Sequence, residues 1–422
     1  MPAANNFPGD SIEDFPSSIR TVPGVATSIA AFIGWAPQGP TDQAQRVLSW
    51  SEFSAHFGGL DSRSLLGYAV SHFFMNGGRE AYIVRLVSSD AAAAATSIPP
   101  PADTPSVGLS ASNSSPPLMG GTSETVLHPN SIAFEAAIGT PGNPSTGALG
   151  LLDQIDLFNL LCVPGETNSA TLSVLEKYCK SRRVFLIADS DPTVTDFNTL
   201  AGGPGFAGAN AAFYFPWLLA PDPLKQNAIQ QFPPCGFVAG IYARTDIAGG
   251  VWKAPAGTEA AVAGVSGTAV LLNDQAIGVL NPVGVNCIRS LPVVGTVLWG
   301  DRTIDGIDKS GSDWKYIPIR RLALYVEGSL FRGIQWALFE PNDETLWAQI
   351  RLSVRSFMQT LYRQGAFQGS TPKDAYYVRC DSTTTTAIDV TNGIVNIEVG
   401  FAPLRPAEFV IIRIQQMAGR QI

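Results

Sequence analysis

The chain has 422 residues, enough for two or three domains, and it is 45% hydrophobic but only 15% charged. A net charge of −8 argues against a nucleic-acid-binding protein, because such proteins neutralise phosphates with an excess of Lys and Arg. The five cysteines are widely spaced and form no C-x-x-C pair, which is typical of free thiols in a reducing compartment.

The N-terminal part begins with a polar arm and continues into an α/β pattern. Residues 1–24 are polar and rich in Pro and Ser, so they are expected to form an extended arm. They carry no apolar run of the kind found in signal peptides, so they are not expected to be one. The run VATSIAAFIG predicts a strand. Residues 65–78 have the apolar spacing of a helix that stops at Asn76-Gly77-Gly78, and EAYIVRLV predicts the next strand.

Residues 91–149 interrupt this pattern. Runs such as AAAAATSIPPPADTPS and GTPGNPSTG are of low complexity and rich in turn-forming residues, which predicts a surface excursion. A β-α-β pattern follows, in which IDLFNLLCVPG and VFLIADSDP are predicted strands and SATLSVLEKYCKS is the helix between them.

Two long helices and three strands are predicted near the C-terminus. Residues 316–338 and 342–364 repeat apolar side chains at helical spacing, and Asn342 is the predicted N-cap of the second helix. The last strand, EFVIIRI, is almost continuously apolar. It either closes the chain's own sheet or adds to the sheet of another subunit, and the residues alone leave both open. The predicted strands are 375–380, 394–401 and 408–414.

The sequence contains only weak matches to motifs for cofactor binding, metal binding or catalysis. GPGFAG, at residues 203–208, matches G-x-G-x-x-G, but a polar segment precedes it and a strand-like run follows, so a glycine-rich loop is favoured. The loop CVPGETNSA precedes a helix but lacks a Walker lysine. The three histidines show no metal-ligand spacing. Asp189 and Asp191, at a strand end, are candidates for catalytic carboxylates, although a capped loop is the favoured interpretation.

Arg351 and Arg355 stand four residues apart on one face of the second long helix. Like charges at this spacing do not pair with each other. The face is therefore either solvated or a docking strip for an acidic partner, and the residues alone leave this open.

Several long stretches, in order, resemble the contractile tail sheath family, which includes phage tail sheaths, R-type pyocins and phage-tail-like injection systems. The N-terminal stretches are GVATSIAAFIGWAPQGP, EFSAHFGG and FFMNGGREAYIVRL. The middle ones are GIYARTDIAGGVWKAPAG, LNPVGVNCIR and VLWGDRTI. The C-terminal ones are YIPIRRLALYVEGSL, FEPNDETLWAQIRLSVRSFMQTLYRQGAFQG and NGIVNIEVGFAPLRPAEFVIIRI. The start, FPGDSIEDFPSS, departs from the family's PGVYVEE-like start.

The resemblance implies a mixed α/β fold with two domains and two arms. An outer α/β domain is expected at 25–315, with 91–149 as its surface excursion, and a tube-proximal α+β domain at 316–406. Arms at 1–24 and 407–422 are expected to complete the small sheets of neighbouring subunits. Arg351 and Arg355 become expected tube-facing residues, and the expected arm residues are Ile12, Phe15, Phe409, Val410, Ile411, Ile412 and Ile414.

The function implied by the resemblance is structural. The chain is expected to polymerise helically around an inner tube in an extended metastable state and to contract, driving the tube through a target envelope. Expected partners are further copies of itself, the inner tube protein, and baseplate and tail terminator or cap proteins. No nucleic acid, membrane insertion, metal, cofactor or enzymatic activity is expected. Assembly is expected in the bacterial cytoplasm, as part of a phage-tail-like particle or virion tail.

The short chain favours an injection system over a contractile bacteriophage tail. Two other classes remain as alternatives. One is a non-contractile shell protein. The other is an α/β enzyme that uses the β-α-β unit near Asp189.

Overall fold

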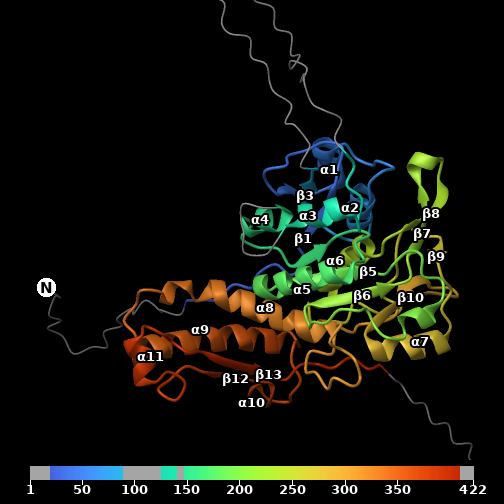
Figure 1. Cartoon of the computed structure of the whole chain (residues 1–422). Coiled ribbons are helices and arrows are strands. Elements are labelled where there is room, and N and C mark those ends of the chain that lie inside the picture. Colours follow the sequence, from blue (N-terminus) through green and yellow to red (C-terminus); the bar gives the residue numbers. More distant parts are fainter. Residues whose placement is uncertain (1–19, 89–124, 140–146, 409–422) are drawn as a thin grey trace, which may run out of the picture. The chain divides into compact units, whose positions relative to one another are not determined.

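A computed structural model describes residues 20–88, 125–139 and 147–408 (Figure 1). These residues form two compact units. The larger unit comprises the described residues between 26 and 325 together with 405–408, and the smaller unit comprises 20–25 and 326–404.

An eight-stranded mixed sheet forms the centre of the larger unit, in the order β11-β10-β6-β5-β4-β1-β3-β2. The six inner strands are parallel to one another. The edge strands β2 and β11 are antiparallel to their neighbours. The strands are β1 (Ala30–Trp35), β2 (Gln45–Val47), β3 (Ala81–Leu86), β4 (Leu160–Cys162), β5 (Phe185–Asp189), β6 (Ala211–Phe215), β10 (Val285–Leu291) and β11 (Gly295–Leu298).

Helices cover both faces of this sheet, because successive side chains of a strand point to opposite faces. Phe32 belongs to the apolar cluster on one face, and its neighbour Ile33 belongs to the cluster on the other. The first cluster packs under α1 (Trp50–Phe57), α2 (Leu65–Met75) and α6 (Cys235–Gly249). The second packs under α3 (Ile132–Ile138), α4 (Gly147–Asp153), α5 (Ser169–Arg182) and α7 (Asp274–Leu280).

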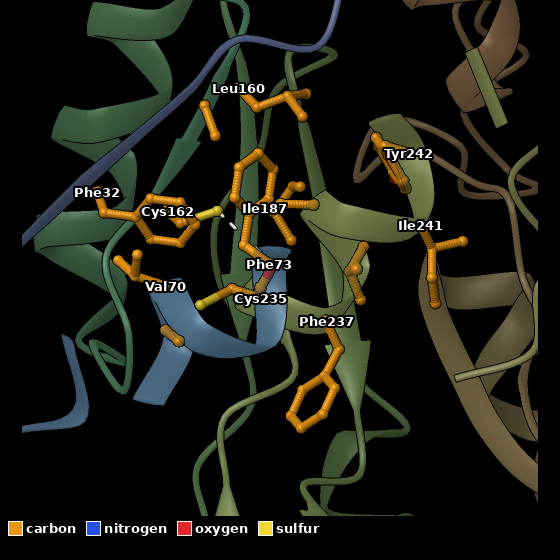
Figure 2. Close-up of a cluster of buried hydrophobic side chains, with 14 of the residues drawn as sticks. Phe32, Val70, Phe73, Leu160, Cys162, Ile187, Cys235, Phe237, Ile241 and Tyr242 are labelled. Atoms are coloured by element: carbon orange, nitrogen blue, oxygen red, sulfur yellow. Dashed lines mark hydrogen bonds between the residues drawn. The ribbon is translucent and has the colours of Figure 1, made fainter. Parts of the chain in front are cut away.

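Figure 2 shows part of the first cluster. The rings of Phe32 and Phe73 meet edge to face, with centroids 5.5 Å apart. The thiol of Cys162 lies 3.7 Å from the carbonyl oxygen of Cys235 at the start of α6. All five cysteines of the chain are free and buried.

A second, three-stranded sheet in the larger unit has the order β8-β7-β9 and is antiparallel. Its strands are β7 (Leu218–Asp222), β8 (Ala228–Phe232) and β9 (Gly267–Thr268). Short 3-10 helices occur at Phe197–Leu200, Pro223–Lys225, Asn281–Val283 and Gln335–Ala337.

The smaller unit combines helices with a two-stranded antiparallel sheet. Helix α8 (Ile317–Gly333) begins in the larger unit and ends in the smaller one. The other elements are α9 (Glu344–Arg363), α10 (Pro372–Ala375), β12 (Tyr376–Arg379), α11 (Ala387–Thr391) and β13 (Glu398–Phe401).

The mixed α/β fold predicted from the sequence is confirmed, including the β4-α5-β5 unit. The surface excursion predicted for 91–149 is wrong for residues 125–139 and 147–149. Residues 147–149 begin α4, and Leu149 is buried in the core. Residues 125–139 contain α3, and Phe134 and Ile138 are buried in the core. The two side chains stand four residues apart and share one face of the short helix, a spacing that the flanking turn-rich runs obscure.

Two boundaries in the smaller unit also differ from the prediction. Asp343, and not Asn342, caps α9, since its side chain accepts a hydrogen bond of 2.9 Å from the backbone N–H of Leu346. Asn342 instead accepts a hydrogen bond from the indole of Trp347. The strand predicted from residue 394 pairs only from Glu398 onward.

Candidate functional site

Helix α9 carries the two arginines that were expected to face a tube. Its buried apolar stripe includes Ile350, Val354 and Phe357, and this stripe leaves Arg351 and Arg355 on another face. An arginine at either position can therefore reach past the helix to a neighbouring element.

Both arginines contact the backbone of β12 or the residue that follows it. Arg351 donates from Nη1 to the carbonyl oxygen of Cys380 and from Nη2 to Glu344 Oε1, at 3.2 Å. Arg355 donates from Nη2 to the carbonyl oxygen of Val378, at 3.4 Å. Arg351 and Arg355 therefore both form hydrogen bonds within their own subunit. Whether it also faces a tube stays a prediction.

The described end of the N-terminal arm is attached to the smaller unit. The guanidinium group of Arg20 lies 4.6 Å from the ring centre of Trp336, and the backbone N–H of Val25 donates to the buried hydroxyl of Ser329. Val22 is buried and lies close to the backbone of Gly333. The expected arm residues Ile12 and Phe15 lie outside the described residues.

The described end of the C-terminal arm is attached to the larger unit by an ion pair. Arg302 donates from Nε and Nη2 to the two carboxylate oxygens of Glu408, at 2.6 and 2.8 Å. Its side chain is 2% exposed, and Nη1 also donates to Asp308 and to the carbonyl oxygen of Asn281. Burial raises the pKa of Glu408, but the hydrogen bonds from Arg302 and the positive charges of Arg302 and Lys315 together outweigh this and hold the pKa below its ordinary value.

The arm residues expected after Glu408 lie outside the described residues: Phe409, Val410, Ile411, Ile412 and Ile414. The ion pair that precedes them was missed in the sequence, although VLWGDRTI contains its signal. Asp301 and Arg302 are a charged pair directly after an apolar strand, where a buried charge needs a partner.

Asp301 is a buried carboxyl group beside this ion pair. It is 7% exposed, and its Oδ2 has no hydrogen-bond partner among the described residues. Burial, together with the nearby Glu408 carboxylate, raises the pKa of Asp301 to about 7. A cavity of about 330 Å³ lies against it, lined among others by Trp299, Pro406 and Ala407.

The raised pKa of Asp301 predicts how stability changes with pH. Between pH 5 and 7 the unfolded chain holds Asp301 ionised while the folded chain keeps it protonated, so this group favours folding less as pH rises. The wild type is expected to lose roughly 2–3 kcal/mol from this group between pH 5 and pH 8. Asp301→Asn should remove that part of the slope in guanidinium chloride unfolding, and Asp313→Asn at an exposed site should not. An unchanged slope in Asp301→Asn would contradict the assignment.

Asp189 is a structural residue. Its two carboxylate oxygens accept hydrogen bonds from the backbone N–H groups of Gly165 and Cys235, at 3.1 and 2.8 Å. It is 1% exposed, and burial raises its pKa to about 6. Asp191 accepts hydrogen bonds from Thr193 in a local turn. The hydrogen bonds of Asp189 join the end of β5 to the start of α6, and its buried carboxyl group is not open to a substrate.

The other motifs have structural roles as well. Strand β6, and not a helix, follows GPGFAG. In the loop CVPGETNSA, the buried carboxylate of Glu166 accepts hydrogen bonds from the backbone N–H groups of Asn130 and Asn168, beside the N-terminus of α5. His72 stacks on Phe237 with ring centres 3.8 Å apart.

Within the described residues there is no cluster of three or more His, Cys, Asp or Glu side chains suited to a metal ion. No described helix is long and apolar enough to span a bilayer.

Comparison with known proteins identifies the family. The phage tail sheath protein central domain matches residues 147–304, and the phage tail sheath C-terminal domain matches residues 309–417. A putative prophage major tail sheath protein of Pseudomonas aeruginosa is 26% identical over 272 residues, which cover 62% of this chain and 67% of that protein. The chain belongs to the contractile tail sheath family. The family is one of structural proteins, as the resemblance implied.

The sheath subunit is also similar to solved sheaths over nearly its whole length. One is the helical sheath of the anti-feeding prophage in its contracted state, with a TM-score of 0.70 and 26% identity over 98% of this chain and 100% of that one. Another is the sheath complex of an extracellular contractile injection system, PVC, in its contracted state. It has a TM-score of 0.69 and 26% identity over 98% of this chain and 99% of that one.

Proposed function

We propose that this sheath subunit belongs to a phage-tail-like contractile injection system. Many copies polymerise helically around an inner tube in an extended metastable state. On a signal from the baseplate, the polymer shortens and drives the tube through a target envelope. The proposal rests on the similarity to injection-system sheaths, which covers 98% of this chain and 99% and 100% of the two solved sheath chains.

The energy for this movement is proposed to reside in the contacts between subunits, without nucleotide hydrolysis. Of the two candidate carboxylates of the β-α-β unit, Asp189 is buried and bonded to backbone N–H groups, and Asp191 accepts hydrogen bonds from Thr193, which supports a non-enzymatic role. The proposed partners are further copies of the chain, the tube, the baseplate and a terminator or cap protein. Assembly is proposed to take place in the bacterial cytoplasm.

Both arms are proposed to add a strand to the small sheet of a neighbouring subunit. The attachments at their bases support this. Val25 and Ser329 hold the N-terminal arm to the smaller unit, and Arg302 and Glu408 hold the C-terminal arm to the larger one. An arm that is attached to its own subunit at one end and paired with a neighbouring sheet at the other can keep both contacts while the subunits move.

Arg351 and Arg355 are proposed to contact an acidic tube surface. An exposed ion pair contributes only about 0–1 kcal/mol, but identical sites on every subunit add up along the polymer. Changing both to Glu is expected to abolish sheathed tubes in negative-stain micrographs while circular dichroism shows a folded subunit. Arg363→Glu, at the exposed end of α9, is the matched control. Normal sheathed tubes from the double variant would exclude the tube contact.

Electron microscopy of the purified protein tests the proposed function itself. A sheath subunit is expected to form long tubes. A small compact oligomer would favour the enzyme alternative.

A further inference from the structure

A turn in the smaller unit places a phenylalanine where glycine is usually required. Residues 337–340 begin at the end of the 3-10 helix Gln335–Ala337, and the N–H of Glu340 donates to the carbonyl oxygen of Ala337 at 3.3 Å. Leu338 has φ −64° and ψ 134°, and Phe339 has φ 69°. These values match a type II β-turn, whose third residue is normally glycine because a side chain is strained there.

The side chain of Phe339 has no packing role within the described chain. It is 106% exposed, and its neighbour Leu338 is 65% exposed. A strained backbone of this kind costs stability, and it is found mainly at sites that bind, switch or react. A large aromatic ring also contributes strongly when an interface buries it. Phe339 therefore has the features of an anchor residue for another surface.

A pocket of suitable size lies in the larger unit. The cavity of about 330 Å³ beside Asp301 is lined in part by the apolar side chains of Ala254, Ile277, Trp299 and Pro406. A cavity of about 150 Å³ can hold a benzene molecule, so this pocket can accept a phenyl ring. Trp299 is 37% exposed, which leaves part of its indole ring free to pack against a second aromatic side chain.

We propose that Phe339 of one subunit inserts into the pocket at Trp299 of a second copy. This rests on the proposed function, in which the chain polymerises with identical copies of itself. A projecting side chain and a pocket elsewhere on the same chain form a head-to-tail contact, which can repeat from copy to copy into a helical polymer. The pocket is also continuous with the proposed interface, because Pro406 and Ala407 at the base of the C-terminal arm line it.

Charge supports the same pairing. Glu340, directly after Phe339, is exposed. Arg289 lies at the pocket, with its guanidinium carbon 5.5 Å from the ring centre of Trp299. It donates from Nη1 to the exposed Asp274, and its Nε has no hydrogen-bond partner among the described residues. An inserted Phe339 brings the carboxylate of Glu340 toward this guanidinium group, and opposite charges at an interface favour the correct partner and orientation.

Replacing Phe339 with glycine tests whether its side chain joins subunits. Phe339→Gly relieves the strained backbone and removes no packing contact within the described subunit, so the unfolding midpoint should be unchanged or higher. Polymer formation without tube protein should fall by at least about tenfold, measured by sedimentation. Normal polymers from this variant would overturn the proposal.

Val293→Gly is the matched control for this substitution. Val293 lies between β10 and β11, is also 106% exposed and has φ 73°. It therefore has the same exposure and a similar backbone strain, but it is not part of the proposed contact. The control should polymerise like the wild type. Equal losses of polymer in Phe339→Gly and Val293→Gly would show that the effect is not specific to Phe339.

An engineered thiol shows what covers the anchor residue. The five native cysteines are all buried, and Leu338→Cys adds an exposed thiol while keeping Phe339. In dilute monomer this thiol should react freely with a maleimide, and in polymers formed without tube protein it should be protected. Protection already in the monomer would mean that the chain's own residues cover the site. Protection only with tube protein would assign the contact to the tube. Either result would contradict a contact between copies.

Cross-linking identifies the pocket. A disulfide forms only where two Cα atoms come within about 7 Å of each other. A Leu338→Cys chain is mixed with a chain that carries Ala254→Cys or Ala407→Cys, and at least one mixture should give a disulfide-linked dimer on a non-reducing gel. Leu224→Cys, which is exposed elsewhere on the larger unit, should give none. Absence of both pocket cross-links in normal polymers would exclude the Phe339 contact alone, whereas absence of polymers from the wild type would contradict the proposed function itself.

Discussion

Deleting residues 409–422 is expected to leave a folded, soluble subunit that forms no tubes. The deletion spares Glu408, so the ion pair with Arg302 stays intact and the larger unit keeps its core. What it removes is the apolar run that is proposed to link one subunit to the next.

The expected loss is large because strand addition combines two favourable contributions. A strand of about six residues makes on the order of six backbone hydrogen bonds, each with a net contribution of about 1 kcal/mol. It also buries apolar side chains against the receiving sheet. A loss on the order of 5 kcal/mol at each junction lowers an association constant by more than about a thousandfold.

Sedimentation and negative-stain microscopy measure this result, and circular dichroism with thermal unfolding checks that the subunit is folded. Deleting residues 1–19 separately is expected to have the same effect while retaining the contact between Arg20 and Trp336. Mixing the two truncated chains should not restore long polymers. If the chain that ends at Glu408 still builds sheaths, the C-terminal segment pairs within its own subunit.

Shortening the chain by one more residue, so that it ends at Ala407, is expected to lower the free energy of unfolding by about 3 kcal/mol. This deletion removes Glu408 and leaves the buried guanidinium group of Arg302 without its bidentate partner. Asp308 and the carbonyl oxygen of Asn281 still accept hydrogen bonds from Arg302. The expected loss of unfolding free energy is therefore at the low end of the range for breaking a buried ion pair.

Guanidinium chloride unfolding of the two truncated chains measures this loss directly, because they differ in one residue. In the full-length chain, Glu408→Ala should reproduce the loss, and Glu340→Ala at an exposed site should not. Equal stabilities for the chains ending at Ala407 and at Glu408 would show that Arg302 does not depend on Glu408.

Elements with local periodicity could be predicted from the sequence. Helix α9 and the β4-α5-β5 unit repeat apolar residues at the spacing of their secondary structure, so short windows predict them. Helix α3 has only two buried side chains, and the turn-rich runs around it hide its pattern.

The contacts that form the candidate site could not be predicted in this way. Arg302 and Glu408 are 106 residues apart, and no local pattern links them. Helical spacing places Arg351 and Arg355 on one face, but only the register of β12 shows that they meet outward-pointing carbonyl groups. Asn342 and Asp343 are both good N-caps, and the hydrogen bond between Asn342 and Trp347 leaves the cap to Asp343.

The length of the sheath in whole particles, at a fixed number of subunits, tests the central claim most directly. Electron micrographs of particles before and after brief treatment with dilute guanidinium chloride measure it, since a metastable polymer shortens once its barrier is lowered. The predicted result is two populations with equal subunit counts, one long and one short, with bare tube projecting from the short sheaths. A single sheath length under both conditions would contradict a contractile function.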